Sequence, residues 1–243
     1  MIINLFRSKP TLRELIPDGF VDIHSHILPG IDDGAKNIDE SLELISQMKN
    51  LGFSKIIGTP HTYLGVHNNT IKSIEESYNK LIKLDLLNDI NVGFASEYMI
   101  DESLIKKAES NSLLTLKDRY VLVEMSFINP PNNLFEILFK LRLYNYTPII
   151  AHPERYRFWF NSFDNFIKLK KMGCKFQTNM FSIIGYYGQD VLKFSDLLLK
   201  KNMIDFIGSD IHKINQIRLF EEKVQISRIE KIERIMNENR FFL

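Results

Sequence analysis

The sequence has a single cysteine, Cys174, and almost no net charge. One cysteine excludes an internal disulfide and a zinc site built from paired cysteines, and it is typical of a reducing compartment. With 31 Lys and Arg against 30 Asp and Glu, the formal charge is +1. This leaves no basic excess for binding nucleic acid or an anionic membrane, so any phosphate chemistry must be local.

Long apolar runs and linkers are also missing. The first residues, MIINLFRSKP, lack the apolar core and the small-residue cleavage site of a signal peptide. No stretch approaches the length of about 18 apolar residues that a transmembrane helix needs. We therefore expect a cytoplasmic protein without an integral membrane segment. No repeat, low-complexity tract or Pro/Gly/Ser linker divides the chain, which indicates a single domain over residues 1–243.

What is present is an alternation of short β-rich apolar runs and longer segments of helical periodicity. Strands are predicted at 20–24, 55–59, 90–96, 120–125, 147–151, 175–178 and 204–208. Helices are predicted at about 37–51, 70–87, 101–109, 132–145, 164–172, 189–201 and 215–236. Asn37 and Glu40 have the spacing of a capping box at the first helix. This βα rhythm favours an α/β barrel, although an open doubly wound sheet has the same pattern.

Five of the six histidines and four carboxylates fall at or just past the predicted carboxyl ends of these strands. In a parallel barrel these ends share one face, which carries the active site. Four ionised carboxylates placed together require cations, and imidazole with carboxylate suits Zn, Mn, Fe and similar divalent ions. The nine candidate ligands are His24, His26, Asp33, His61, Glu97, Glu124, His152, Asp210 and His212.

The motif DIHSH is the sharpest local signal for a metal site. Alternation along a strand points His24 and His26 to the same side, where both imidazoles reach one ion. A polar pair ending a strand is the alternative explanation. Taken alone, Asp32 and Asp33 in IDDG favour a turn or a helix cap. His61, which follows a strand and a proline, is as consistent with a structural role as with a ligand.

The remaining motifs follow the same pattern. Glu97 and Glu124 end apolar runs and need partners if they are buried. Arg155, in IIAHPERY, is placed to hold an oxyanion through two hydrogen bonds, with a surface salt bridge as the alternative. His67 has no strand before it, and we expect it on the solvated surface. The purely structural explanation fails for the set, because coincidence would have to place all these groups at strand ends.

The motif order HxH, DDG, PH, E, E, HPER and SDxH resembles the PHP (polymerase and histidinol phosphatase) superfamily of metal-dependent phosphoesterases. More narrowly, DIHSHILPGIDDG, TPHTY, ASEY, LVEMS, IAHPERY and GSDIH look like the CpsB/CapC-type bacterial protein-tyrosine phosphatases. The resemblance covers about residues 20–212, so residues 1–19 form an N-terminal extension of unknown role. It implies a distorted seven-stranded (β/α) barrel of the PHP type, with a metal site at the C-terminal ends of the strands.

The resemblance also implies a cofactor and roles for individual residues. Up to three divalent ions are implied, manganese first, with Fe, Zn, Co or Mg as alternatives. Arg155 would contact phosphate, and His212 or Asp210 would donate a proton; the position of Arg218 departs from the family pattern. The ions would be held in turn by His24, His26, Glu124 and Asp210; by Asp33, His61 and His212; and by Glu97, Glu124 and His152, with Glu124 bridging.

The activity implied is hydrolysis of phosphotyrosine by in-line attack of a metal-bound hydroxide. The implied partner is a phosphotyrosine protein, namely the C-terminal tail of a bacterial tyrosine kinase that regulates capsule or exopolysaccharide synthesis. Cysteine chemistry is excluded, because the arginine of a cysteine-dependent phosphate loop would fall at Met180. The alternatives are another PHP phosphoesterase, such as a histidinol-phosphate phosphatase, and a non-catalytic metal-stabilised scaffold. A nuclease ranks last because the net charge provides no basic groove.

Loop aromatics provide the remaining clue to the substrate. They follow predicted strands on the face expected to carry the metals, where they would either hold a phenyl ring or pack the loops onto the barrel. These residues are Tyr63, Phe127, Phe158, Trp159, Phe160, Tyr186 and Tyr187.

Overall fold

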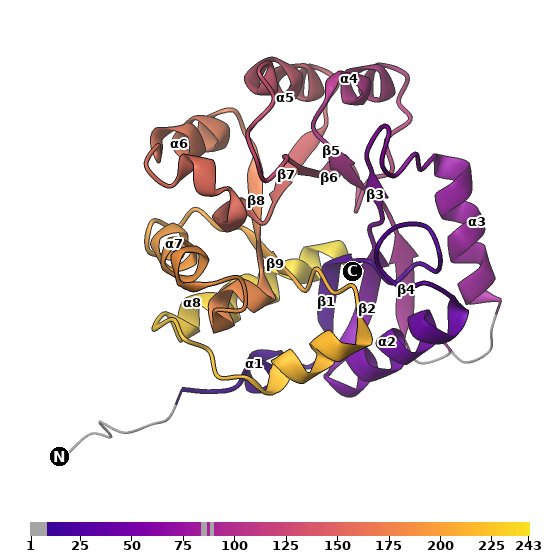
Figure 1. Cartoon of the computed structure of the whole chain (residues 1–243), viewed down its shortest axis with the longest axis vertical. Coiled ribbons are helices and arrows are strands. Elements are labelled where there is room, and N and C mark those ends of the chain that lie inside the picture. The colour runs from indigo at the N-terminus through magenta and orange to yellow at the C-terminus, as the bar shows by residue number, and fades with distance from the viewer. Residues whose placement is uncertain (1–8, 84–86, 88–89) are drawn as a thin grey trace.

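Parallel strands form a ring at the centre of the molecule, and helices surround the ring (Figure 1). The computed structural model describes residues 9–83, 87 and 90–243. The strands are β1 Phe20–Ser25, β2 Phe53–Gly58, β3 His61–Thr62, β4 Asn91–Phe94, β5 Glu97–Met99, β6 Tyr120–Glu124, β7 Thr147–Ala151, β8 Lys175–Asn179 and β9 Phe206–Gly208. Hydrogen bonds group them as β1-β2-β4 and β3-β5-β6-β7-β8-β9.

The two sheets follow one another around the ring because two strands are interrupted. β2 resumes as β3 and β4 resumes as β5, so the ring has seven strand positions, as the predicted barrel requires. For the strand predicted at 90–96, the predicted carboxyl end is wrong, because β4 ends at Phe94 and a separate strand, β5, begins at Glu97. The break lies opposite Pro60, which has no N–H to donate to a continuous ladder.

The ring closes between β1 and β9, a junction that we call the β1/β9 seam. At its carboxyl end, Ser25 forms a parallel bridge with Ile211. The N–H of His26 donates to the carbonyl of Ile211, and the N–H of Asp210 donates to that of His24, both at 2.8 Å. The backbone bonds of the seam therefore lie among the predicted metal ligands.

At the other end of the seam, the side chain of Asn239 takes the place of backbone pairing. Its Nδ2 donates to the carbonyls of Val21 (2.8 Å) and Ile207 (2.6 Å), and its Oδ1 accepts from the N–H of Ile207 (3.2 Å). Asn239 is fully buried. One amide thus satisfies three buried backbone groups that would otherwise lack partners.

We expect Asn239→Ala to lower the free energy of unfolding by about 3 kcal/mol, because the three backbone groups at the seam would lose their partner. Urea unfolding followed by circular dichroism measures this change. The matched control is Asn237→Ala, since the Asn237 amide lies two residues earlier and donates to the carbonyl of Glu233 on the exposed surface. Equal effects of the two substitutions would contradict the role of Asn239.

Between residues 37 and 202 the helices outside the ring agree with the predictions, with slightly shorter ends, whereas α1 (Leu12–Leu15) was not predicted. Asn37 caps its helix by accepting from the N–H of Glu40 (3.0 Å). Part of the helix predicted at 70–87 lies outside the described residues. None of the described helices has the length and apolar character needed to cross a membrane. They are α1 Leu12–Leu15, α2 Ile38–Asn50, α3 Ile71–Ile82, α4 Glu102–Glu109, α5 Leu134–Leu143, α6 Asp164–Lys171, α7 Gln189–Lys200 and α8 Ile229–Glu238.

The helix predicted at 215–236 is wrong as a single element. A 3-10 segment covers Ile214–Glu221, and α8 begins only at Ile229. The chain between them does not continue the helix, because the N–H of the fully buried Val224 donates to the carbonyl of Pro10 (2.9 Å). A contact with a segment remote in sequence therefore overrides the helical periodicity.

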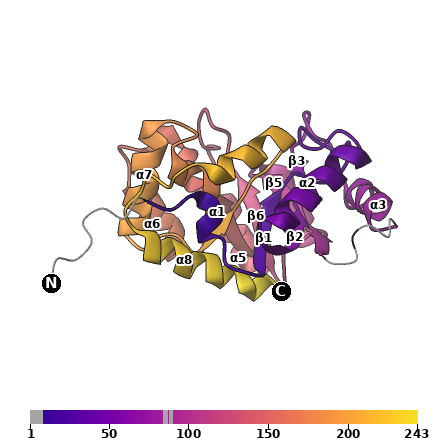
Figure 2. The ribbon, with the colours of Figure 1, turned by 90° about the horizontal axis from the view of Figure 1, so that it is seen from below.

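An apolar cluster fills the ring below the predicted metal ligands, and the C-terminal segment closes its far end. Figure 2 shows α8 and the C-terminus together at that end. The buried ring of Phe242 packs edge-on against Phe206 (4.9 Å between centroids) and Tyr120 (6.0 Å). The C-terminal RFFL therefore contributes Phe242 to the core, while Arg240, Phe241 and Leu243 are exposed. The buried cluster consists of Val21, Ile23, Ile57, Ala95, Leu116, Leu122, Ile149, Ala151, Phe206 and Phe242.

Candidate metal centre

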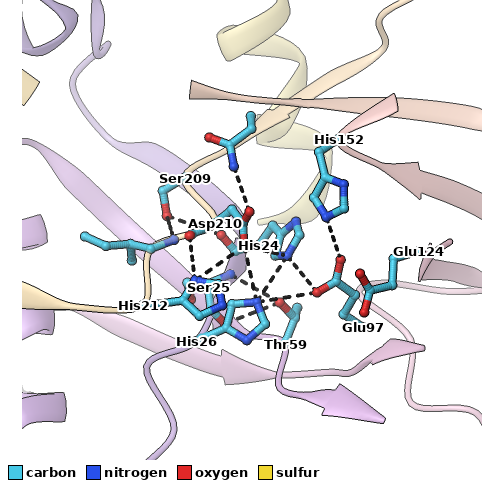
Figure 3. A network of polar contacts seen from close by, with 12 residues as sticks. His24, Ser25, His26, Thr59, Glu97, Glu124, His152, Ser209, Asp210 and His212 are labelled. Atoms are coloured by element: carbon cyan, nitrogen blue, oxygen red, sulfur yellow. Dashed lines mark hydrogen bonds and ion pairs between the residues drawn. The ribbon is translucent and has the colours of Figure 1, made fainter. Parts of the chain in front are cut away.

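All nine predicted ligand side chains come together at the carboxyl ends of the strands; Figure 3 shows seven of them. They form four overlapping groups, and within each group the ligand atoms lie within 4.8 Å of one another. The groups are His26, Asp33, His61 and His212; His24, His26 and Glu97; His24, His152 and Asp210; and His61, Glu97 and Glu124.

Glu97 occupies the middle of the cluster. Its Oε2 lies 3.1 Å from His24 Nε2, 3.1 Å from His61 Nδ1 and 3.4 Å from His26 Nε2. Its Oε1 lies 3.2 Å from His152 Nε2, and the residue is fully buried. Glu97 reaches this position because β5 starts with it, after the break opposite Pro60.

Glu124 takes a more lateral position than the family resemblance implied. It approaches His61 at 2.9 Å and shares a group with His61 and Glu97, but not one with His24 and Asp210. The structure thus places Glu97, and not Glu124, between the groups. The reason is the parallel register, which pairs Glu124 with Met99 and sets Glu97 two residues deeper in the ring.

Candidate ligands lie on both sides of the β1/β9 seam. Asp210 Oδ1 lies 3.3 Å from His24 Nε2 across the seam. Gly208 permits this approach, because a Cβ there would lie 2.7 Å from the Cβ of His24. Asp210 and His152 adopt left-handed φ angles of 53° and 33°. A positive φ angle is uncommon in residues other than glycine, and such a conformation is typically retained where a site requires it.

A buried carboxylate absent from the predictions fixes the loop after β9. Asp22 accepts hydrogen bonds from the N–H (2.9 Å) and the hydroxyl of Ser209, the residue before Asp210. Burial raises the pKa of Asp22 to about 6, even though these hydrogen bonds favour its charged form. Asp22 therefore positions Asp210 from the opposite side of the seam.

Two further residues orient the histidines of DIHSH. His24 Nδ1 lies 2.7 Å from Gln177 Oε1, and His26 Nδ1 lies 2.7 Å from Asp32 Oδ2. In both rings Nε2 consequently faces Glu97, as expected where polar partners hold metal-binding imidazoles. Asp32 also accepts from the N–H of Gly34 (2.9 Å), so the turn predicted for IDDG is present.

The charges of the cluster depend on one another. Burial opposes the charged form of His26, but Asp32, Asp210 and Glu97 outweigh burial and raise its pKa well above the usual value. Burial likewise disfavours ionised Asp210, but the nearby histidines, His24 first, hold its pKa well below the usual range. Asp210 therefore stays ionised at neutral pH, and an incoming cation would displace a proton from His26.

The donor set fits divalent cations. Ligand atoms about 2.1 Å from one ion lie within about 4.2 Å of each other, which is compatible with groups whose ligand atoms all lie within 4.8 Å of one another. Within the described residues, Glu97 Oε1 and His61 Nδ1 are buried side-chain atoms whose nearest polar neighbours, His152 and Glu124, do not have the geometry of a hydrogen bond. Both atoms face other members of the cluster, as the ligands of a shared ion would. Imidazole and carboxylate donors without thiolate accept several ions and do not select one.

Arg155 lies at the rim of the cluster. Its Nη1 donates to Asp210 Oδ2 (3.0 Å), and its guanidinium sits between the rings of Phe127 (4.4 Å) and Tyr187 (4.2 Å). Asn179 Nδ2 donates to the same Asp210 oxygen at 2.7 Å. The salt bridge foreseen as an alternative exists, but its partner is a candidate ligand, so Arg155 remains next to the site.

The prediction that His67 is solvated surface is wrong. The loop after β3 folds back, with the N–H of Tyr63 donating to the carbonyl of His67 (2.9 Å) and the reverse bond at 2.8 Å. The half-buried ring of His67 consequently stacks on His61, with centroids 5.5 Å apart.

The loop aromatics divide into two sets of three, and Tyr186, which is 51% exposed and contacts Tyr187, belongs to neither. Phe158, Trp159 and Phe160 pack on the outer core. Tyr63, Phe127 and Tyr187 lie beside the cluster, where they line two pockets.

Cys174 is buried just before β8, at the end of the ring opposite the cluster. Burial raises the pKa of its thiol to about 12, so it stays protonated and inert, as predicted.

Comparisons with known proteins agree with this geometry. The family model "Capsular polysaccharide synthesis, CpsB/CapC" matches residues 20–236. Tyrosine-protein phosphatase YwqE of Bacillus subtilis (strain 168) is 32% identical over 214 residues, which are 87% of this chain and 84% of YwqE. Tyrosine-protein phosphatase CpsB of Streptococcus pneumoniae is 27% identical over 203 residues, 80% of this chain and 84% of CpsB.

Solved structures confirm the fold. A chain from the crystal structures of YwqE and CpsB, described as unique metal-dependent tyrosine phosphatases, superposes with a TM-score of 0.71 at 31% identity and covers 81% of both chains. Histidinol phosphate phosphatase from Lactococcus lactis subsp. lactis Il1403 shares the fold with a TM-score of 0.57 at 13% identity, covering 92% of this chain and 94% of its own. With a family match over most of its length and these relatives, the chain belongs to the CpsB/CapC family.

Proposed function

We propose that this protein is a metal-dependent phosphatase that hydrolyses phosphotyrosine in proteins. The observation that carries the proposal is the buried cluster of nine imidazole and carboxylate groups around Glu97, with Arg155 at its rim. This arrangement suits a phosphate dianion held between cations and a guanidinium. The similarity to YwqE and CpsB, both named tyrosine-protein phosphatases, supports the choice of substrate.

The nine groups would hold up to three divalent ions, with manganese first and Fe, Zn, Co or Mg as alternatives. Glu97 would bridge neighbouring ions, because its two oxygens face different groups of histidines. When bound, such ions lower the pKa of water and neutralise charge on phosphate oxygens. The protein contributes the fixed positions of the ligands, through Asp22, Asp32 and Gln177.

Arg155 and His212 would act on the substrate directly. Arg155 needs only to turn from Asp210 to donate two hydrogen bonds to phosphate oxygens, while Asn179 continues to hold Asp210. Phosphotyrosine releases a phenolate whose conjugate acid has a pKa of about 10, so little protonation is required. Asp210 stays ionised and cannot supply this proton, and His212, whose side chain is 19% exposed, would supply it only while its ring is not a ligand.

The proposed partner is a phosphotyrosine protein in the cytoplasm, namely the C-terminal tail of a bacterial tyrosine kinase involved in capsule synthesis. The family description supports the link to capsular polysaccharide. A flexible tail suits a site at the rim of a barrel, because an extended peptide reaches buried cations without rearrangement of the fold.

The test is turnover of a phosphotyrosine peptide and of histidinol phosphate by purified protein, with manganese and with a chelator. We expect turnover of the peptide that is lost on chelation and restored by manganese. Cys174→Ala should retain it, because the thiol lies at the other end of the ring. Preference for histidinol phosphate would assign the other phosphatase activity, and metal-loaded protein inert towards aryl phosphates would indicate a scaffold.

A further inference from the structure

An apolar pocket of about 380 Å³ opens next to the metal centre. Two of its lining residues, His61 and Glu124, are proposed ligands, so the pocket is continuous with the centre. Its walls come from the loop after β3 and from the end of β5 and β6 with the loop that follows. The apolar wall consists of Tyr63, Val66, Met99, Met125, Phe127 and Ile128.

Several of these wall residues are exposed to an unusual degree. The exposed fraction is 84% for Ile128, 60% for Val66 and 47% for Phe127. Side chains of this kind gathered on two neighbouring loops mark a binding surface more often than a structural one. Their position beside the proposed ligands indicates that the surface serves the reaction site.

A second, smaller pocket on the other side of Phe127 has a different character. It measures about 200 Å³ and is lined by Arg155 and Arg157 together with Phe127, Tyr187 and Val191. Two guanidinium groups suit the anionic part of a substrate. Phe127 therefore separates a basic space from an apolar one, and both adjoin the centre.

We infer that the apolar pocket binds the aryl ring of the phosphate ester and so selects aryl over alkyl phosphates. This inference rests on the proposed function, because it assumes that phosphorus lies between the ions and Arg155. A single ester oxygen then joins the ring to phosphorus, so the ring must lie against the ligands. A cavity of about 150 Å³ holds benzene, so the pocket takes the ring and part of the adjoining peptide.

The experiment compares the double variant Val66→Ser/Ile128→Ser with the control Phe139→Ser/Leu143→Ser. Both pairs are exposed, and the control residues lie on α5, 56% and 63% exposed. Calorimetry on manganese-loaded protein gives the Kd of phenylphosphonate and of inorganic phosphate. We expect the pocket variant to weaken phenylphosphonate about fivefold, through lost apolar contact, and to leave phosphate unchanged. For phenyl phosphate hydrolysis, KM should rise and kcat should stay constant.

Three results would overturn the inference. One is an equal loss of affinity for phosphate and phenylphosphonate, and another is an equal effect of the control pair. The third is unchanged phenylphosphonate binding with weaker binding of a phosphotyrosine peptide, which would assign the pocket to a residue flanking the tyrosine. Failure of the proposed function is distinguishable, because protein without turnover can still show the expected difference in phenylphosphonate binding.

Discussion

Glu97→Gln should remove metal binding and phosphatase activity together. The amide keeps the shape of the side chain, but it removes the negative charge that faces His24, His26, His61 and His152. We expect kcat/KM for a phosphotyrosine peptide to fall about a thousandfold, because charge stabilisation at the reacting group is lost. Elemental analysis of the purified variant should show fewer ions per chain than the wild type.

Glu124→Gln is the informative comparison for this variant. Glu124 approaches His61 from the side and does not share a group with the seam ligands, so its loss should cost less metal and less activity. If Glu124→Gln were the more damaging change, Glu124 and not Glu97 would be the residue shared between ions, as the family resemblance implied. A Glu97→Gln variant with full metal content and full turnover would refute the assignment of the centre itself.

Arg155→Lys should lower kcat/KM about a hundredfold while the metal content stays constant. Lysine retains the charge but loses the planar fork that donates two parallel hydrogen bonds to phosphate. It also loses most of the stacking between Phe127 and Tyr187 that holds the guanidinium in place. Steady-state kinetics on phenyl phosphate and elemental analysis measure the two quantities.

The control for Arg155→Lys is Arg218→Lys. Arg218 is exposed, and its position in the sequence departs from the family pattern, so we expect less than about a twofold change. Loss of metal in Arg155→Lys would show that its bond to Asp210 supports the ligands rather than the substrate. Full activity of this variant would remove Arg155 from the reaction.

The ring and the convergence of the nine candidate ligands could be predicted from the sequence because both follow from local patterns. Strand ends in a parallel barrel meet on one face, so polar residues such as His24 and His152 at those ends had to converge. The break between β4 and β5 was harder to predict from the sequence, since it depends on Pro60, which lies between the neighbouring strands β2 and β3. Periodicity likewise carried no sign of the bond from Val224 to Pro10 that ends the helix predicted at 215–236.

The residues that position the candidate ligands or close the seam could not be predicted, because their roles also depend on partners remote in sequence. Asp22, Gln177 and Asn239 are polar residues within or next to apolar segments, and this is a weak signal for buried partners. Their hydrogen-bond partners lie more than a hundred residues away for Asp22 and Gln177. Such roles depend on register between remote strands, which a single sequence does not specify.

The position of the β1/β9 seam has a consequence for biosynthesis. Two of the four ligand groups need Asp210 or His212, which leave the ribosome long after His24 and His26. Until β9 emerges, β1 is an edge strand of an incomplete sheet, and domains fold as units. The nascent chain therefore lacks the finished cage during most of translation, and a complete cage for cations can form only after β9 and the residues that follow it have been synthesised.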